Sequence, residues 1–217
     1  MEHLINIAGQ LLPGLGILLE VFALTVAIGI PLGMCICLLR MSKIRPLKWL
    51  SQIYILIFRG TPLMLQLIFF FLAWPIIFGK GAAMERTFAA IVAFALNYAA
   101  YFAEIFRGGI QSVPRGQYEA AQVLGLSHRQ CFFKIVVPQV VKRVIPPMGN
   151  EFVTLVKDTA LVYAIAINDI TRIAKTIMMN ENDMLAFIVA GIFYLILTTL
   201  VTFAFNAIEK KLDYYKI

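Results

Sequence analysis

This sequence of 217 residues carries little charge, because Asp, Glu, Lys and Arg together make up only 14% of it. Soluble domains usually contain about 25% of these residues. Hydrophobic residues make up 61%, and the mean hydropathy is +0.84. A soluble chain of this length could not bury so much apolar surface in its core. The composition therefore predicts a membrane protein and argues against an ordinary soluble domain.

Cysteine and histidine are also scarce, with three Cys and two His residues. Cys35 and Cys37 lie two positions apart inside an apolar run, so on a helix they face away from each other. His3 and His128 have no further ligands at the spacing of a metal site. We therefore expect no metal site, and free cysteines that behave as small apolar side chains.

The sequence also lacks the motifs of a nucleotide-using enzyme. Its Gly-Lys pair, Gly79-Lys80, is followed by Gly81, whereas a phosphate-binding loop has Ser or Thr at that position. No nucleophile with a neighbouring base stands out either. The sequence therefore predicts a protein that is not an enzyme and that binds no cofactor itself.

What the chain does contain is five apolar stretches, each long enough for a membrane-spanning helix, which needs about 20 residues. They lie at about 15–39, 50–78, 88–106, 144–167 and 185–208. No Ser/Gly-rich linker or repeat separates them. We therefore expect an all-α membrane protein with five transmembrane helices in a single domain, 1–217.

The basic residues predict the orientation, because Lys and Arg collect on the cytoplasmic side of a membrane. With the N-terminus outside, 13 of the 19 are cytoplasmic and four are outside. The cytoplasmic ones are Arg40, Lys43, Arg45, Lys48, Arg107, Arg115, Arg129, Lys134, Lys142, Arg143, Lys210, Lys211 and Lys216. Those outside are Lys80, Arg86, Arg172 and Lys175. The C-terminus is then cytoplasmic, and the net charge of +7 needs no nucleic-acid partner.

Proline interrupts two of the apolar stretches. Pro62 lacks a backbone N–H and disfavours helix at Thr61, so we expect a break or kink there. The fourth stretch is expected to begin irregularly at Pro146, Pro147 and Gly149. Broken helices are tolerated in membranes where they face protein or a water-lined cavity.

Ionisable residues inside these stretches are candidates for function, because each costs about 2.5–3.5 kcal/mol to insert. Glu151, Thr154 and Asp158 lie on one helical face, with Lys157 on the adjoining stripe. One interpretation is a substrate path in which two carboxylates bind an ammonium or guanidinium group. The other is an internal network in which Lys157 neutralises an acid.

Four further polar positions leave their roles open. Arg59 and Gln66 are seven residues apart and could share a face across the break. Arg59 either binds a substrate carboxylate or extends to the cytoplasmic phosphates. Glu104 and Arg107 have the spacing of a helical ion pair.

The long cytoplasmic loop, about 108–143, contains a pattern of two capped helices. Residues 119–124 favour helix, and Gly125 suits a left-handed stop. Ser127 and Gln130 have the spacing of a capping box, and Pro138 is expected to stop the second helix or bend the next one. Such a segment is either a docking surface for a partner or a well-capped connector.

This loop resembles the EAA signature of bacterial ABC importer permeases. The matching positions are Glu119-Ala120-Ala121, Gly125 and Ile135-x-Val137-Pro138, with Val137 where the signature usually has Leu. Other blocks are similar to the polar amino-acid uptake branch of these permeases. They are Phe58-Arg59-Gly60-Thr61-Pro62, Ala103 to Ile110, Ser112 to Gln117, and Lys157-Asp158-Thr159-Ala160-Leu161, where Ser is commoner than Ala160.

The resemblance implies a type I importer permease in a bacterial cytoplasmic membrane. Two such permeases, identical or different, would form the pathway. Two ATPase subunits would bind ATP and Mg, and an extracytoplasmic binding protein would deliver the amino acid. The EAA helices would sit in grooves on the ATPases, so the expected coupling residues are Glu119, Ala120, Ala121, Gly125, Ser127 and Pro138.

The substrate is predicted from the polar strip. Glu151 with Asp158 favours a cationic amino acid such as arginine, lysine or histidine, with Thr154, Lys157, Gln66 and Arg59 as further candidate contacts. The alternative is a neutral or acidic polar amino acid such as glutamine, glutamate or cystine. A stand-alone channel or an ion-driven transporter is the alternative class, and a membrane scaffold is a third.

Overall fold

The computed structural model describes residues 2–212, apart from the side chain of Lys80, and this range contains helices and no strand. The α-helices are α1 (Glu2–Met41), α2 (Arg45–Gly60), α3 (Leu63–Ile68), α4 (Trp74–Phe78), α5 (Arg86–Gln111), α6 (Arg115–Val123), α7 (His128–Cys131), α8 (Val137–Asp158), α9 (Ile170–Glu181) and α10 (Leu185–Leu212). Phe69–Ala73 and Phe132–Val136 are π-helical, and Lys80–Ala82 and Thr159–Ile165 are 3-10 segments. Lys216, used above for the orientation, lies outside the described residues.

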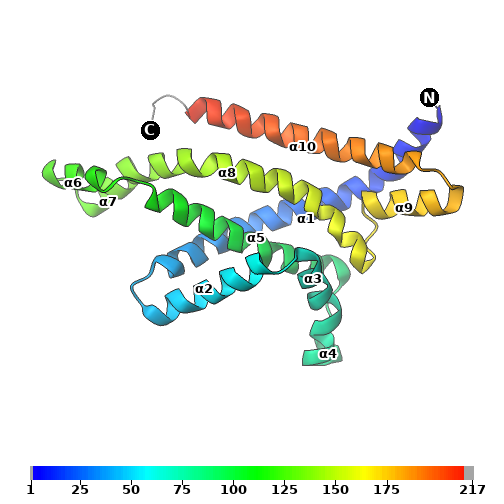
Figure 1. Ribbon diagram of the computed structural model, residues 1–217, viewed down its shortest axis with the longest axis horizontal. Coiled ribbons are helices and arrows are strands. Elements are labelled where there is room, and N and C mark those ends of the chain that lie inside the picture. The colour runs from blue at the N-terminus through cyan, green and yellow to red at the C-terminus, as the bar shows by residue number, and fades with distance from the viewer. Residues whose placement is uncertain (1, 213–217) are drawn as a thin grey trace.

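Helix α5 forms the centre of the bundle, and α1, α2 and α8 pack against it (Figure 1). Its buried face is rich in alanine, at positions 89, 90, 93, 95, 99, 100 and 103. Helix α1 meets this face through glycine, and a Cβ on Gly33 would lie 2.8 Å from the Cβ of Phe102. Small residues let helices approach closely in a bilayer, where dispersion contacts drive their association. The α1–α5 contact therefore depends on these small residues.

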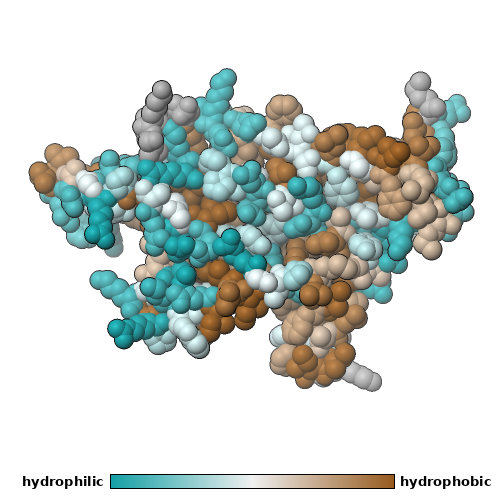
Figure 2. All heavy atoms as spheres, in the orientation of Figure 1, coloured by the Kyte–Doolittle hydropathy of each residue, from teal (hydrophilic) through white to brown (hydrophobic). Residues whose placement is uncertain are grey.

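Three helices, α1, α5 and α10, are long and apolar enough to cross a membrane, and the bent pair Arg45–Gly60 and Leu63–Phe78 adds a fourth if it is one span. Helix α8 corresponds to the remaining predicted span, but its many polar and basic residues keep it out of this set. Figure 2 shows hydrophobic residues gathered over α4 and the N-terminal half of α10. The count of five spans and the orientation of the termini stay predictions.

The expected irregular start of the fourth stretch at Pro146, Pro147 and Gly149 is wrong. All three residues lie inside α8, which is continuous from Val137 to Asp158. Prolines are tolerated in a membrane helix when neighbouring elements support it, and α8 packs against both α5 and α10. The chain leaves α-helical geometry only after Asp158, in the 3-10 segment that ends at Ala166 with a φ of 64°.

The predicted break at Thr61 and Pro62 is confirmed. Helix α2 ends at Gly60, and the segment Leu63–Phe78 turns by 104° relative to it. Thr61 has an extended backbone, with φ −119° and ψ 147°, as expected for a residue before proline. Its hydroxyl donates a hydrogen bond of 2.8 Å to the carbonyl of Ile57, which caps the end of α2.

Two buried amides hold this bend. The Nε2 of Gln66 donates to the carbonyl oxygens of Phe58 (3.0 Å) and Thr61 (3.1 Å). The Nδ2 of Asn97, on α5, donates to the same Phe58 carbonyl (2.8 Å) and to the Oε1 of Gln66 (3.0 Å). These bonds satisfy the carbonyl groups that the break frees, which is the condition for a broken helix in a membrane.

We expect Gly14→Ala to destabilise the protein and Gly16→Ala to leave it as stable or more so. A Cβ on Gly14 would lie 2.5 Å from the backbone N of Ile170, whereas a Cβ on Gly16 would meet nothing within 4 Å. Forcing α1 away from α9 should cost about 1–3 kcal/mol. Thermal unfolding of the purified protein in detergent measures this. Equal melting temperatures for the two variants would contradict the close approach.

We expect Gln66→Leu to lower the melting temperature, because it leaves the carbonyl groups of Phe58 and Thr61 short of buried donors at a cost of about 1–3 kcal/mol. Gln122→Leu, at an exposed position of α6, is the control. The structural role of Gln66 would be refuted if the variant melted normally and lost only substrate affinity.

Candidate functional site

A cavity of about 620 Å³ lies where the break between α2 and α3 faces α5 and the C-terminal end of α8. This acidic cavity is lined by Arg59, Gly60, Thr61, Pro62, Leu63, Met64, Asn97, Tyr98, Tyr101, Glu151, Thr154, Asp158 and Leu161. Its charged side chains are one guanidinium and two carboxylates. The 104° bend separates α2 from α3 at this point, and residues on both sides of it line the cavity.

Two of the three charged groups of the acidic cavity are held by aromatic side chains of α5. The hydroxyl of Tyr98 donates a hydrogen bond of 2.7 Å to the Oδ2 of Asp158. The guanidinium of Arg59 lies over the ring of Tyr101, with its Cζ 4.9 Å from the centroid, which is a cation–π geometry. Among the described residues, the carboxylate of Glu151 accepts no hydrogen bond and has no ion-pair partner within 4 Å, so it is available to a ligand.

The structure brings four of the six predicted substrate contacts together. Arg59, Glu151, Thr154 and Asp158 line the acidic cavity. Gln66 does not line it, because its amide holds the bend. Lys157 is exposed outside the lining, and no described carboxylate lies within 4 Å of its ammonium group. Lys157 therefore makes no ion pair within 4 Å among the described residues, although its charge still acts on Asp158.

Tyr98 is a site residue that the sequence did not indicate. It lies three residues before Tyr101, so helical spacing places both on one face of α5. This spacing could have pointed to Tyr98, but a tyrosine in an apolar helix is equally typical of a core position. Its partnership with Asp158 depends on how α5 crosses α8, which spacing along one helix does not specify.

The predicted pair of Glu104 and Arg107 is confirmed, with an Arg107 Nη2 to Glu104 Oε2 distance of 2.5 Å. Arg40 at the end of α1 joins it, with its Nε 3.5 Å from the Oε1 of Glu104. The cluster ties the ends of α1 and α5 together. The cluster lies outside the acidic cavity, and Arg40 and Arg107 are the ion-pair partners of Glu104.

The loop between α5 and α8 has the predicted capped geometry. Gly125 adopts a φ of 68°, in the left-handed region that favours glycine. The N–H of Leu126 donates to the carbonyl of Ala121 (3.0 Å), and the N–H of Gly125 donates to that of Gln122 (2.9 Å). These two bonds form a Schellman motif, which ends α6 with its last carbonyls satisfied.

The second helix begins as expected but does not end at Pro138. Ser127 and Gln130 form a complete capping box at the start of α7. The N–H of Val137 then donates to the carbonyl of Phe132, one residue further back than in an α-helix, which makes a π-helical turn. Pro138 lies in the first turn of α8, so the helical chain runs from His128 to Asp158.

The α6–α7 elbow, residues 115–131, presents both polar and apolar surface. Glu119 and Ala120 are exposed, whereas Ala121 is buried against Val113 and Cys131. Val123 is 88% exposed and Leu124 is 75% exposed, so the tip of the elbow is apolar. An exposed apolar tip of this kind indicates a contact with another protein.

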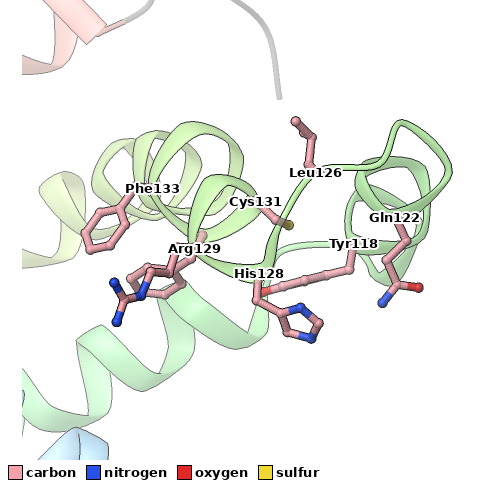
Figure 3. Close-up of a pocket in the computed structure, with 8 residues that line it drawn as sticks. Tyr118, Gln122, Leu126, His128, Arg129, Cys131 and Phe133 are labelled. Atoms are coloured by element: carbon pink, nitrogen blue, oxygen red, sulfur yellow. The ribbon is translucent and has the colours of Figure 1, made fainter.

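A hollow of about 430 Å³ lies beside the tip. Figure 3 shows Tyr118 and Gln122 on one side of it and Arg129 and Phe133 on the other, with His128 between them. The remaining lining residues are Leu126, Cys131 and Phe132. The lining is mostly apolar, so the hollow and the tip together form a surface suited to a protein partner.

Comparison with known proteins identifies the family. Residues 26–214 match the family described as "Binding-protein-dependent transport system inner membrane component". The arginine transport system permease protein ArtQ of Bacillus subtilis is 36% identical over 203 residues, covering 93% of this chain and 92% of that protein. The L-cystine permease TcyB of the same organism is 36% identical, covering 86% of this chain and 80% of that protein. The glutamate/aspartate permease GltK of Escherichia coli O157:H7 is 34% identical and covers 87% of each.

Solved structures agree with these relatives. The crystal structure of an amino acid ABC transporter with histidines superimposes with a TM-score of 0.87 at 33% identity, over 95% of this chain and 96% of that one. The MetNI methionine transporter, at 20% identity and a TM-score of 0.70, shares the fold. The chain therefore belongs to the binding-protein-dependent inner-membrane components of ABC transporters, as a permease of the polar amino-acid branch.

Proposed function

We propose that this permease imports a cationic amino acid, such as arginine, lysine or histidine, by alternating access driven by partner ATPases. The observation that carries the proposal is the charge of the acidic cavity, which has two carboxylates, Glu151 and Asp158, and one guanidinium, Arg59. A cationic amino acid carries two positive groups and one negative group. The cavity therefore offers the complementary set, which a neutral amino acid would leave unbalanced.

Each group of the substrate has a suitable partner in the acidic cavity. The open carboxylate of Glu151 and that of Asp158, held by Tyr98, would bind the two cationic groups. Arg59 would bind the α-carboxylate through the bidentate geometry that guanidinium groups favour. The ring of Tyr101 would hold the Arg59 guanidinium in place for this contact, since aromatic faces attract cations. Thr154 adds a hydroxyl at the wall of the cavity.

The α6–α7 elbow would transmit the movement of the ATPases. Its exposed tip, at Val123 and Leu124, suits a groove on an ATPase surface. The helical chain that begins at α7 runs on through α8 to Glu151 and Asp158, so a displacement of the elbow would move the acidic face of the cavity. ATP-driven closure of two ATPases would draw two elbows together and open the pathway outward, and hydrolysis would reverse this.

We infer the orientation from the positions of the basic residues and from the shape of the molecule. Figure 1 places α6 and α7 at one end of the molecule and the N-terminus and α9 at the other. The arginines and lysines assigned to the cytoplasm lie mainly at the α6–α7 end, which supports five spans with the N-terminus outside and the C-terminus inside. The chain would lie in a bacterial cytoplasmic membrane. ATP and Mg would bind to the ATPases alone.

The transporter would contain a second permease, identical or different, two ATPase subunits and an extracytoplasmic binding protein. Uptake into proteoliposomes by the assembled complex tests this. We expect transport of labelled arginine that requires internal ATP and the ATPase. Flux without either would favour a stand-alone channel, and uptake driven by an ion gradient would favour an ion-coupled transporter.

We expect Glu151→Gln to weaken arginine binding to the purified complex about tenfold, which corresponds to about 1.4 kcal/mol. Binding of glutamine, which lacks the second cation, should change less. Glu20→Gln, at an exposed position of α1, is the control. Isothermal titration measures both affinities. An unchanged arginine affinity would remove the support for a cationic substrate and leave glutamine, glutamate or cystine as the alternative.

We expect Gly125→Val to insert normally but to uncouple ATP hydrolysis from uptake. A β-branched residue at a φ of 68° costs at least about 1–2 kcal/mol and would distort the elbow. Gly125→Asn should retain coupling, because Asn tolerates the left-handed region. Gly108→Val, at an exposed glycine of α5 with open space, controls for bulk. The ratio of amino acid imported to ATP hydrolysed is the measurement, and a normal ratio in Gly125→Val would count against the coupling role.

A further inference from the structure

A second cavity, of about 470 Å³, lies between α9, α3 and the 3-10 segment after α8. Figure 1 shows α9 at the end of the molecule away from the α6–α7 elbow. This α9 cavity is lined by Met64, Ile68, Tyr163, Ala164, Arg172, Lys175, Thr176 and Met179. It is separate from the elbow and from the break that shapes the acidic cavity.

The charged side chains of the α9 cavity are both positive. Arg172 and Lys175 are three residues apart on α9, so they project from one face of that helix. The ammonium group of Lys175 lies 5.8 Å from the centroid of the Tyr163 ring, across the cavity from α9. No carboxylate lines the cavity, and none among the described residues lies within 4 Å of either cation.

The acid that caps the start of α9 is already engaged. Asp169 caps the start of α9 by accepting from the backbone N–H groups of Thr171 and Arg172, each at 3.0 Å. It also accepts from the hydroxyl of Tyr194 at 3.4 Å. Asp169 therefore serves the backbone of α9, and the side chains of Arg172 and Lys175 keep their capacity for an external anion.

The α9 cavity borders the acidic cavity, because Met64 lines both. Two neighbouring cavities of opposite charge match the two ends of a free amino acid. The α9 cavity would attract the carboxylate, and the acidic cavity would attract the ammonium group and a cationic side chain. A zwitterion that enters from the α9 end would meet the positive groups first.

We propose that Arg172 and Lys175 form a subsite for the α-carboxylate of an incoming amino acid, ahead of the acidic cavity and divided from it by Met64. This inference rests on the proposed import function, since it concerns the path of the substrate. The shared wall at Met64 and the position of Lys175 over Tyr163 favour a small ligand inside the cavity over an acidic protein surface resting on α9.

A cysteine reporter in the wall tests the charge of the subsite. Thr176→Cys is introduced into the assembled transporter after Cys35, Cys37 and Cys131 have been replaced by Ala. Labelling rates are compared for an anionic methanethiosulfonate (the ethylsulfonate) and a cationic one (the ethyltrimethylammonium). We expect the anionic reagent to react about threefold faster relative to its rate with free thiol, and the preference to shrink as salt is raised.

Protection by ligands then tests what the subsite binds. Arginine should slow labelling of Thr176→Cys more than agmatine does, because agmatine keeps the guanidinium and an ammonium but lacks the carboxylate. The double variant Arg172→Gln with Lys175→Gln should abolish both this difference and the anionic preference. The exchange variant Arg172→Lys with Lys175→Arg should retain both the difference in protection and the preference for the anionic reagent.

The control is Arg86→Gln. Arg86 is also a positive group over an aromatic ring, with its Cζ 5.9 Å from the centroid of Phe71, but it does not line the α9 cavity. This variant should leave labelling and protection unchanged. Melting temperatures of all variants show whether each is folded.

The outcomes separate the proposals. Equal protection by arginine and agmatine, or protection that survives neutralisation of both cations, would overturn the carboxylate subsite. Loss of uptake in the double variant with intact protection would place the cations at the contact with the binding protein and would also overturn it. If arginine protects in the predicted way but ATP-dependent uptake is absent, the subsite stands and the import function fails.

Discussion

The structure depends on one constraint, which is that a polar group surrounded by apolar material needs a partner inside the protein. Helix α2 breaks at Thr61 and Pro62, and this break is sustained because Gln66 and Asn97 bind the carbonyl groups that it frees. The same rule places Tyr98 against Asp158. Residues on both sides of the bend line the acidic cavity, so the two amides of α3 and α5 that hold the bend also hold this wall of the site.

The coupling proposed above rests on the continuity of the helical chain. The α7 and α8 helices are joined by a π-helical turn, so the second helix of the elbow and the two carboxylates belong to one helical run. The α6–α7 elbow is rigid in itself, because a Schellman motif closes its first helix and a capping box opens its second. In the proposed function, such an elbow would connect a partner mechanically to the polar face of the cavity.

Local features were predictable because they depend on neighbouring residues only. The left-handed Gly125, the capping box of Ser127 and the break before Pro62 all follow from the stereochemistry of a few consecutive positions. The expected interruption at Pro146 and Pro147 was wrong because α5 and α10 support α8 along its length. Propensity describes an isolated helix, whereas packing decides whether a proline is tolerated in an assembled one.

The sequence by itself determined the apolar, helical character of the chain, the capped elbow with its EAA pattern, and the placement of Glu151, Thr154 and Asp158 on one face. These depend on composition and on the helical period. Only the tertiary structure decided that Arg59 and Tyr98 join the carboxylates, that Gln66 turns to the backbone, and that Lys157 stays outside. The reason is physical: these contacts depend on the angle between α2 and α3 and on where α5 crosses α8, and both are set by packing between distant segments.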